Sequence, residues 1–340
     1  MKNNYKIKRK RKRKKLEFKR RVKKRIKNTY IKLLILLALF IIIIIMNGKI
    51  FISTKPKPKY FTCLASMVKL ENRYIRESVE HYLKLGVDKF YFAEDNEPDG
   101  ERIADVLQDY IDKGIVVVIN AIGAKWDPID FYELALRRLN NVCEWMIYFD
   151  IDEFLEFRNK SMTIKDYLTL DGFDKCEVIK IHWLVYCDND LVHYDNRPLE
   201  ERFTKPDYNN NGNKFHKSIV RVKDYNITMF DSTGHQPNET YTYSCDAAGR
   251  YYKLPINILG SPNYKYCYLK HYNMKTAEEF LMKILRGQKG NKPYDYDQKI
   301  QKIDKFFSCN KVTEEKLKIF ENALNMTFPK YHNRANEDNK

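Results

Sequence analysis

The sequence has 340 residues, of which 44% are hydrophobic and 31% are charged, and its formal net charge is +17. Residues 1–32 hold 18 Lys and Arg and one acidic residue, and the remainder of the chain holds 44 residues of each sign. A nucleic-acid-binding domain needs a basic surface on its folded part. The neutral balance beyond residue 32 therefore argues against nucleic acid as a partner.

The N-terminal segment has the pattern of a membrane signal anchor. Residues 33–46 are uninterruptedly apolar, and the apolar character extends to residue 52. A helix of about 18 residues spans a thin bilayer core, and positive charge flanking an anchor stays cytoplasmic. We therefore predict a basic cytoplasmic tail over 1–32, a transmembrane helix over 33–52 and a type II single-pass protein.

Two other interpretations of this segment are weaker. A cleaved signal peptide has an apolar region of about 7 to 15 residues that ends at a small-residue cleavage site, and no such site follows Met46. Residues 9–15 alone are typical of a nuclear localisation signal or an RNA-binding arm, but they stand close to a membrane-length apolar run.

The rest of the chain is predicted to form one large domain across the membrane. Residues 53–59 contain alternating lysine and proline and form a stiff stem. Residues 60–330 suffice for one α/β domain, and 331–340 form a polar tail that we expect to fray. Seven cysteines lie beyond the apolar run, where disulfides can form; their odd number leaves at least one unpaired, and their spacing has no zinc signature.

Strands and helices are predicted to alternate from residue 60. Hydrophobic periodicity predicts strands over 61–68, 88–93, 115–120 and 145–149, and helices over 74–85, 102–110 and 129–142. The pattern is less regular afterwards, with helices over 163–168 and 276–286 and strands over 177–186 and 218–222. Such alternation predicts a doubly wound α/β domain with a mostly parallel sheet.

Three acidic side chains follow the strand predicted over 145–149. Asp150, Asp152 and Glu153 fall within four positions, and the carboxyl ends of strands in an open α/β sheet are where ligands bind. The mutual repulsion of these carboxylates suggests a bound Mg²⁺ or Mn²⁺, to which the diphosphate of a nucleotide sugar would bridge. An ordinary acidic turn after a strand is the alternative.

Five stretches between residues 61 and 287 carry a family resemblance. They are Cys63–Lys69 with Glu71-Asn72, Leu85–Tyr91 with Asp95, Asn96 and Asp99, Asp150–Phe154, Lys217–Arg221, and His271–Phe280 with Lys283 and Arg286-Gly287. In this order they resemble the inverting glycosyltransferases of family 92 (DUF23) and related GT-A-fold enzymes. The chain departs from the pattern at Leu70, at Glu97-Pro98, and at Thr276, which replaces a serine.

The resemblance implies a GT-A-like fold and a metal site. Asp150 and Asp152 would hold Mn²⁺ or Mg²⁺ and the diphosphate, and a late histidine often supplies a third ligand in this fold. His235 and His271 are the two candidates. A hydrogen-bonded structural histidine is the alternative for each.

The resemblance also implies the nucleotide cleft. Asp95 with Asn96 would face the ribose or base, and Glu71 or Asn72 would line the same cleft. The cations that could neutralise the diphosphate are Lys217, Lys275 and Arg286. Trp126 and Trp183 could stack on a sugar, although large aromatic residues are usually core.

The implied activity is the transfer of a hexose, with inversion, from a nucleotide sugar to a glycan acceptor. The family suggests UDP-galactose as donor, and the topology suggests a Golgi protein with a lumenal catalytic domain. Inversion needs a carboxylate base, for which Glu153, Asp231 and Asp246 remain open. The alternative function is a non-catalytic lumenal glycan-binding or scaffold protein that retains the fold.

Overall fold

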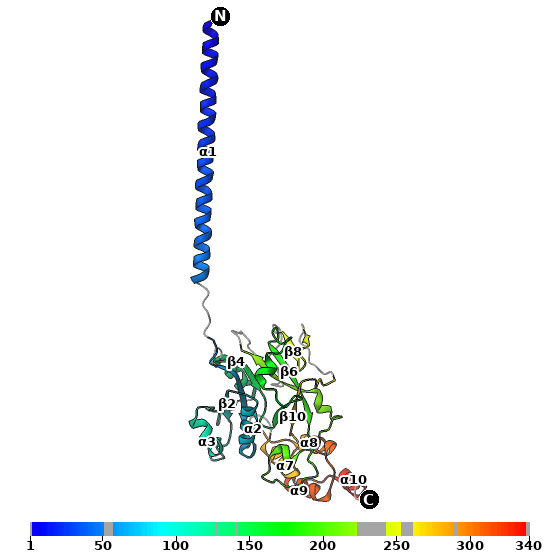
Figure 1. The fold of residues 1–340 in the computed structure, drawn as a ribbon. Coiled ribbons are helices and arrows are strands. Elements are labelled where there is room, and N and C mark those ends of the chain that lie inside the picture. The colour runs from blue at the N-terminus through cyan, green and yellow to red at the C-terminus, as the bar shows by residue number, and fades with distance from the viewer. Residues whose placement is uncertain are drawn as a thin grey trace. The chain divides into compact units, whose positions relative to one another are not determined.

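In the computed structural model the chain divides into two compact units, residues 1–56 and 57–340 (Figure 1). The residues that the structure describes are 2–50, 57–124, 126, 128–139, 142–222, 243–252, 261–287 and 292–337.

The described part of the first unit, residues 2–50, is a single helix, α1 (Lys2–Ile50). Large apolar side chains from Leu33 to Ile42 are exposed along it. Among the described residues, no helix is both long and apolar enough to cross a membrane. The span predicted over 33–52 and the stem predicted over 53–59 lie partly outside the described residues.

The second unit is built on a mixed, mostly parallel sheet with the strand order β3-β2-β1-β4-β7-β6-β10-β5. The first half is parallel and consists of β1 (Tyr60–Val68), β2 (Lys89–Glu94), β3 (Val116–Asn120) and β4 (Cys143–Tyr148). The other strands are β5 (Glu153–Phe157), β6 (Val178–Val185), β7 (His216–Arg221), β8 (Ser244–Asp246), β9 (Tyr251–Tyr252) and β10 (Cys267–His271). The predicted α/β class is confirmed, although β7 and β5 pair antiparallel with their neighbours.

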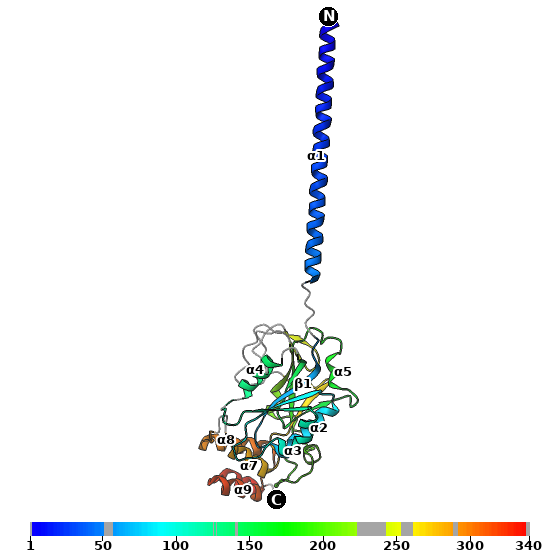
Figure 2. The same cartoon turned by 90° about the vertical axis from the view of Figure 1, so that its left-hand side faces the viewer.

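Helices cover both faces of the parallel half, because successive side chains of a strand point to opposite faces. Leu64 packs with α2 (Asn72–Lys84), α3 (Ala104–Asp112) and α5 (Ile164–Leu168), whereas Cys63 and Ala65 pack with α4 (Pro128–Arg138). Figure 2 shows α4 on one side of the sheet and α2 and α5 on the other. All seven elements predicted between residues 60 and 150 are present, with bounds that differ by at most four residues.

Four helices gather at one end of this unit (Figure 1). They are α7 (Ala277–Arg286), α8 (Tyr296–Cys309), α9 (Glu314–Leu324) and α10 (Pro329–Glu337). The chain between β6 and β7 holds the short α6 (Leu199–Arg202) and the 3₁₀ turn η1 (Asn211–Lys214). A separate apolar core unites the four helices, with Phe280, Phe306 and Phe320 at its centre.

The expectation of a frayed tail over 331–340 is wrong for its first residues. Tyr331 is buried, its ring lies 4.7 Å from that of Phe307 between centroids, and its hydroxyl donates to Asp304. This packing continues the last helix to Glu337. Residues 338–340 lie outside the described residues.

Three disulfides join distant parts of the domain. They are Cys63–Cys143, Cys176–Cys245 and Cys187–Cys309. Cys267 is the unpaired seventh cysteine and is buried. The last of the three bonds attaches the C-terminal end of α8 to the segment after β6, and so fixes that helix against the sheet.

Candidate active site

The acidic motif forms the tight turn between β4 and β5. The backbone N–H of Asp150 donates to the Glu153 carboxylate over 2.9 Å and closes the turn. The Asp150 side chain accepts a hydrogen bond from the Tyr132 hydroxyl at 3.1 Å and pairs with Lys217 at 2.9 Å. Asp150 is thus held toward α4 and β7, with 42% of its side chain exposed.

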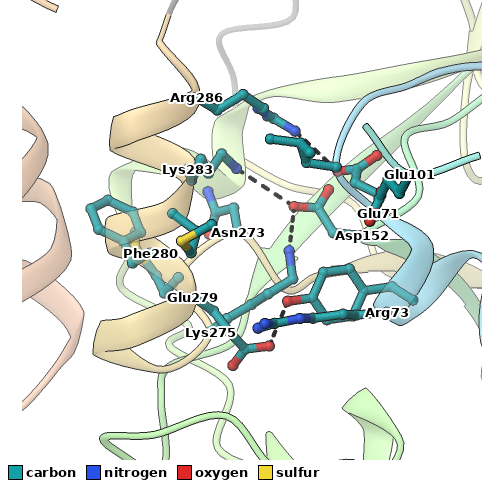
Figure 3. A pocket seen from close by; sticks show the side chains of 14 residues that line it. Glu71, Arg73, Glu101, Asp152, Asn273, Lys275, Glu279, Phe280, Lys283 and Arg286 are labelled. Atoms are coloured by element: carbon teal, nitrogen blue, oxygen red, sulfur yellow. Dashed lines mark hydrogen bonds and ion pairs between the residues drawn. The ribbon is translucent and has the colours of Figure 1, made fainter. Parts of the chain in front are cut away.

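Asp152 points the other way, toward α7 (Figure 3). One carboxylate oxygen, Oδ2, lies 3.1 Å from the Lys275 ammonium and 3.5 Å from that of Lys283. Burial alone disfavours the charged carboxylate, but the two lysines outweigh burial and hold the pKa of Asp152 well below its usual value. Asp152 is therefore a buried carboxylate whose ionised form is favoured.

Glu153 is fully buried, and it is a structural part of the turn. Burial raises the pKa of Glu153 well above its usual value, Lys217 opposes this, and Asp150 raises it again. The residue does not line the cleft described below. Of the other two candidate bases, Asp246 is buried in β8, where it accepts hydrogen bonds from Arg250 and Asn263, and Asp231 lies outside the described residues.

His271 reaches the motif because β10 pairs antiparallel with β5, which sets His271 opposite Glu153. Its Nε2 lies 3.8 Å from Oδ1 of Asp152, the oxygen that faces away from the lysines. The ring packs against Trp183 at a tilt of 47°, with 4.1 Å between centroids. Burial lowers the pKa of His271 to about 3, so the ring is neutral and can act as a ligand.

The pair formed by Asp152 Oδ1 and His271 Nε2 fits part of a divalent-metal site. Ligands that share one ion at about 2.1 Å lie roughly 3 Å apart when cis, so a small inward movement would suffice. The Asp150 carboxylate does not lie close enough to Asp152 and His271 to form a group of three possible metal ligands with them. In the described ranges the only such set is Cys187, Asp207 and Cys309, whose sulfurs form a disulfide, and His235 lies outside those ranges.

A cleft of about 370 Å³ opens where β1, β2 and β4 end. Its lining includes Glu71, Asp95, Asp150, Asp152, His271 and Arg286 from the predicted set, together with both Trp126 and Trp183. The structure thus brings six of the predicted polar residues and both tryptophans to one cleft. Lys275 lines an adjoining smaller cavity that shares Asp152, Lys283 and Arg286 with the cleft (Figure 3).

Three predicted residues support the cleft instead of lining it. Asn96 accepts a hydrogen bond from the backbone N–H of Leu70 at 2.8 Å, which holds that residue at its left-handed φ of 53°. The Asn72 amide donates to the Arg102 carbonyl at the start of α3. Lys217 is buried beneath Asp150.

Sequence reasoning missed three lysines of the cleft. Lys283 lies on α7, and its spacing in the fifth motif was a usable signal. Lys302 and Lys305 lie on α8, a helix that was not predicted. Burial lowers the pKa of Lys283 to about 8. Lys305 is classed as exposed, but desolvation of its ammonium lowers its pKa. The positive charge of Lys302 lowers this pKa further, as expected for like charges on one side of the cleft.

Glu71 at the end of β1 is predicted to make stability depend on pH. Burial raises its pKa to about 7, Arg286 opposes this at 3.5 Å, and Asp152 adds to the rise. Because the folded pKa exceeds the usual 4.5, the fold favours the protonated form, and this stabilisation is lost as pH rises from about 4.5 through 7. We expect wild-type protein to lose roughly 3 kcal/mol relative to Glu71→Gln over this window.

Urea unfolding at pH 5, 6, 7 and 8 measures this difference. The matched control is Glu201→Gln, an exposed glutamate on α6, which should leave the wild-type pH dependence unchanged. Parallel pH profiles of wild type and Glu71→Gln would contradict the prediction.

The whole of this region falls within a match to a known family. The model of glycosyltransferase family 92 matches residues 59–308. The chain belongs to glycosyltransferase family 92. The recognition made from the five stretches is thereby confirmed.

A family 92 protein of rice (Oryza sativa subsp. japonica) is 31% identical over 108 residues, which are 31% of this chain and 18% of the rice protein. The chain therefore matches less than a fifth of that relative's length. Among solved structures, S. aureus TarS 1–349 in complex with UDP matches with a TM-score of 0.38 and 13% identity, covering 73% of this chain and 70% of TarS. The galactosyltransferase LgtC matches with a TM-score of 0.23 and 13% identity, covering 38% and 47%.

Proposed function

We propose that this family 92 member is a glycosyltransferase with a GT-A-like, doubly wound fold that moves a hexose from a nucleotide sugar to a glycan acceptor with inversion. The observation that carries the proposal is the ionised Asp152 at the end of a buried strand, in a cleft with a neutral histidine and several cations. A site of this kind suits a diphosphate bound through a metal ion.

The two oxygens of Asp152 have separate roles in this proposal. Lys275 and Lys283 hold Oδ2, so Oδ1 stays directed toward His271, where Mn²⁺ or Mg²⁺ would bind. A bound ion would supply positive charge at the oxygen that leaves with the nucleotide. Glu71 and Asp95, at the ends of β1 and β2, face the same cleft and would accept hydrogen bonds from the nucleoside.

The aromatic wall supports a sugar substrate. Trp126 and Trp183 both line the cleft, and Trp183 is fixed by its contact with His271. An aromatic face of this kind can pack against the apolar face of a hexose.

The direct test measures donor hydrolysis and sugar transfer by the full chain over a panel of UDP-, GDP- and CMP-sugars, with Mn²⁺ and with chelator. We expect turnover of a UDP-hexose that chelator removes and Mn²⁺ restores. The anomeric configuration of the product, read by NMR, tests inversion. Absence of turnover with every donor would refute the enzymatic proposal, and turnover indifferent to chelator would refute the role of the metal.

We also propose that a membrane anchor over 33–52 places the domain in an oxidising secretory compartment, most simply the Golgi lumen. The three disulfides of the domain support this, since such bonds persist in oxidising compartments. The exposed apolar side chains between Leu33 and Ile42 support a membrane contact. Protease treatment of sealed microsomes should leave the domain intact, and its digestion would refute the proposed topology.

A further inference from the structure

Helix α8 brings two lysines to the cleft, in a place that the acidic motif does not explain. Lys302 and Lys305 line the main cleft together with Lys283 of α7. The same three lysines surround a small cavity of about 30 Å³ beside Asn273, between the two helices. Side chains from two helices thus converge on one point.

This group carries more positive charge than the described residues balance. Within the described ranges, neither Lys302 nor Lys305 has a carboxylate within ion-pair distance. The Lys302 ammonium lies over the Tyr294 ring, 4.9 Å from its centroid. Lys283 shares its only described carboxylate, Asp152, with Lys275. Like charges that gather without counter-charges raise the free energy of the empty site, and an anion would relieve that repulsion.

Asn273 supplies a second, independent observation. It is 6% exposed, and its Oδ1 is buried with no hydrogen-bond partner among the described residues. The side chain lies beside Lys283 (Figure 3) and lines the cleft and both smaller cavities. A buried amide without a partner is costly, and because its oxygen and nitrogen can exchange places by a flip, it can present N–H donors to an anion.

We propose that Lys283, Lys302, Lys305 and Asn273 form a phosphate site that holds the diphosphate of the sugar donor and of the released nucleotide. This inference rests on the proposed function. The site adjoins Asp152 and Arg286 in the same cleft, so a diphosphate could contact both the lysines and a metal bound at Asp152. Several cations can contact both linked phosphate groups of a diphosphate, whereas a monoester or a carboxylate offers them only one anionic group.

Calorimetric titration of the full chain, with Mn²⁺ present, tests the site. The ligands are UDP, GDP and ADP, the matching monophosphates, and inorganic pyrophosphate. We expect the best diphosphate to lose about tenfold or more in affinity in the Lys302→Met/Lys305→Met variant, as charge-assisted hydrogen bonds are lost. Its monophosphate should change less than threefold or so, because it lacks the second phosphate group.

The control is Lys318→Met, which removes one positive charge from an exposed position on α9. It should leave every affinity unchanged. The lysine site would be overturned if the double substitution weakened diphosphate and monophosphate binding equally, or if diphosphate binding survived it. The proposed function would remain standing in either case. A double variant that binds diphosphate normally but loses activity with an anionic acceptor would also overturn the lysine site. A wild-type chain that binds none of the nucleotides would overturn the proposed function as well.

Discussion

Replacement of Asp152 by asparagine is expected to lower the rate of sugar transfer by about 10³-fold. The rate is measured with whichever nucleotide sugar the donor panel shows to be the substrate. Oδ1 of this carboxylate faces His271, and Oδ2 holds Lys275 and Lys283. The amide keeps the shape but removes the negative charge that a metal ion and both ammonium groups require. Loss of one preorganised electrostatic contact at a reacting centre costs about 10²–10³-fold, and here several depend on one group.

The same variant should be moderately destabilised, because two lysines lose their shared counter-charge. Circular dichroism and thermal unfolding therefore accompany the rate measurement, so that a folded, inactive variant is distinguished from an unfolded one. Asp297→Asn, at an exposed position on α8, is the control and should retain full activity. Full sugar transfer by Asp152→Asn would contradict the role proposed for this carboxylate, whereas absence of transfer in the wild type as well would favour a non-catalytic protein that retains the fold.

The position of this site could be predicted because it depends on local sequence. The strand before Asp150 is a continuous apolar run that ends in acids, and the carboxyl ends of β1, β2 and β4 meet because those strands are parallel neighbours. Asp95, Glu71 and Asp152 therefore had to lie near one edge. The structure confirms that they share a cleft.

The rest depends on contacts between segments far apart in the chain. His271 faces Glu153 through an antiparallel pairing of two five-residue strands, and nothing in either strand specifies the other as its partner. Asn72 and Asn96 are polar residues of the kind that often bind ligands. In the structure their side chains form hydrogen bonds with backbone groups of neighbouring loops. Lys302 and Lys305 reach the cleft because the core of the C-terminal helices packs α8 beside α7, and the sequence of α8 alone does not indicate this packing.

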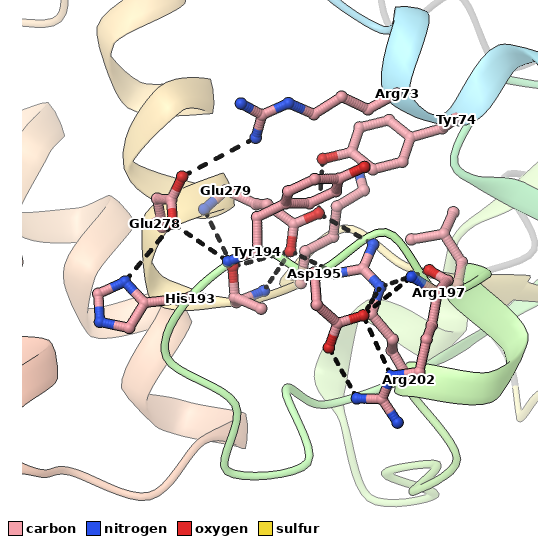
Figure 4. Close-up of polar contacts among 12 residues, drawn as sticks. Arg73, Tyr74, His193, Tyr194, Asp195, Arg197, Arg202, Glu278 and Glu279 are labelled. Atoms are coloured by element: carbon pink, nitrogen blue, oxygen red, sulfur yellow. Dashed lines mark hydrogen bonds and ion pairs between the residues drawn. The ribbon is translucent and has the colours of Figure 1, made fainter.

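The position of α7 itself depends on a buried ion pair (Figure 4). The Arg202 guanidinium donates to both oxygens of Glu279 at 2.8 and 3.1 Å, and both side chains are 1% exposed. Glu279 also accepts hydrogen bonds from the Tyr74 hydroxyl at 2.6 Å and from Thr276, the N-cap of α7. One carboxylate thus connects α6, α2 and the first turn of the helix that carries Lys283 and Arg286.

Arg202→Met is expected to destabilise the domain by about 4 kcal/mol, because it leaves the Glu279 carboxylate buried without its counter-charge. Thermal unfolding should show a loss of about 10 °C or more. The matched control is Arg197→Met, which breaks the ion pair with Asp195 at a side chain that is 53% exposed, and should cost less than about 1 kcal/mol.

The double variant Arg202→Met/Glu279→Leu separates the pair's net contribution from the cost of the stranded charge. We expect it to recover most of the stability lost in Arg202→Met, since replacing both members of a buried ion pair by apolar groups is often nearly neutral. Its donor KM should nevertheless exceed that of the wild type, because Glu279→Leu removes the hydrogen bonds that the carboxylate accepts from the hydroxyl and backbone N–H of Thr276, which help to fix Lys275 and the first turn of α7. A double variant with wild-type KM would mean that packing alone positions the helix, and that the ion pair has no part in holding the donor.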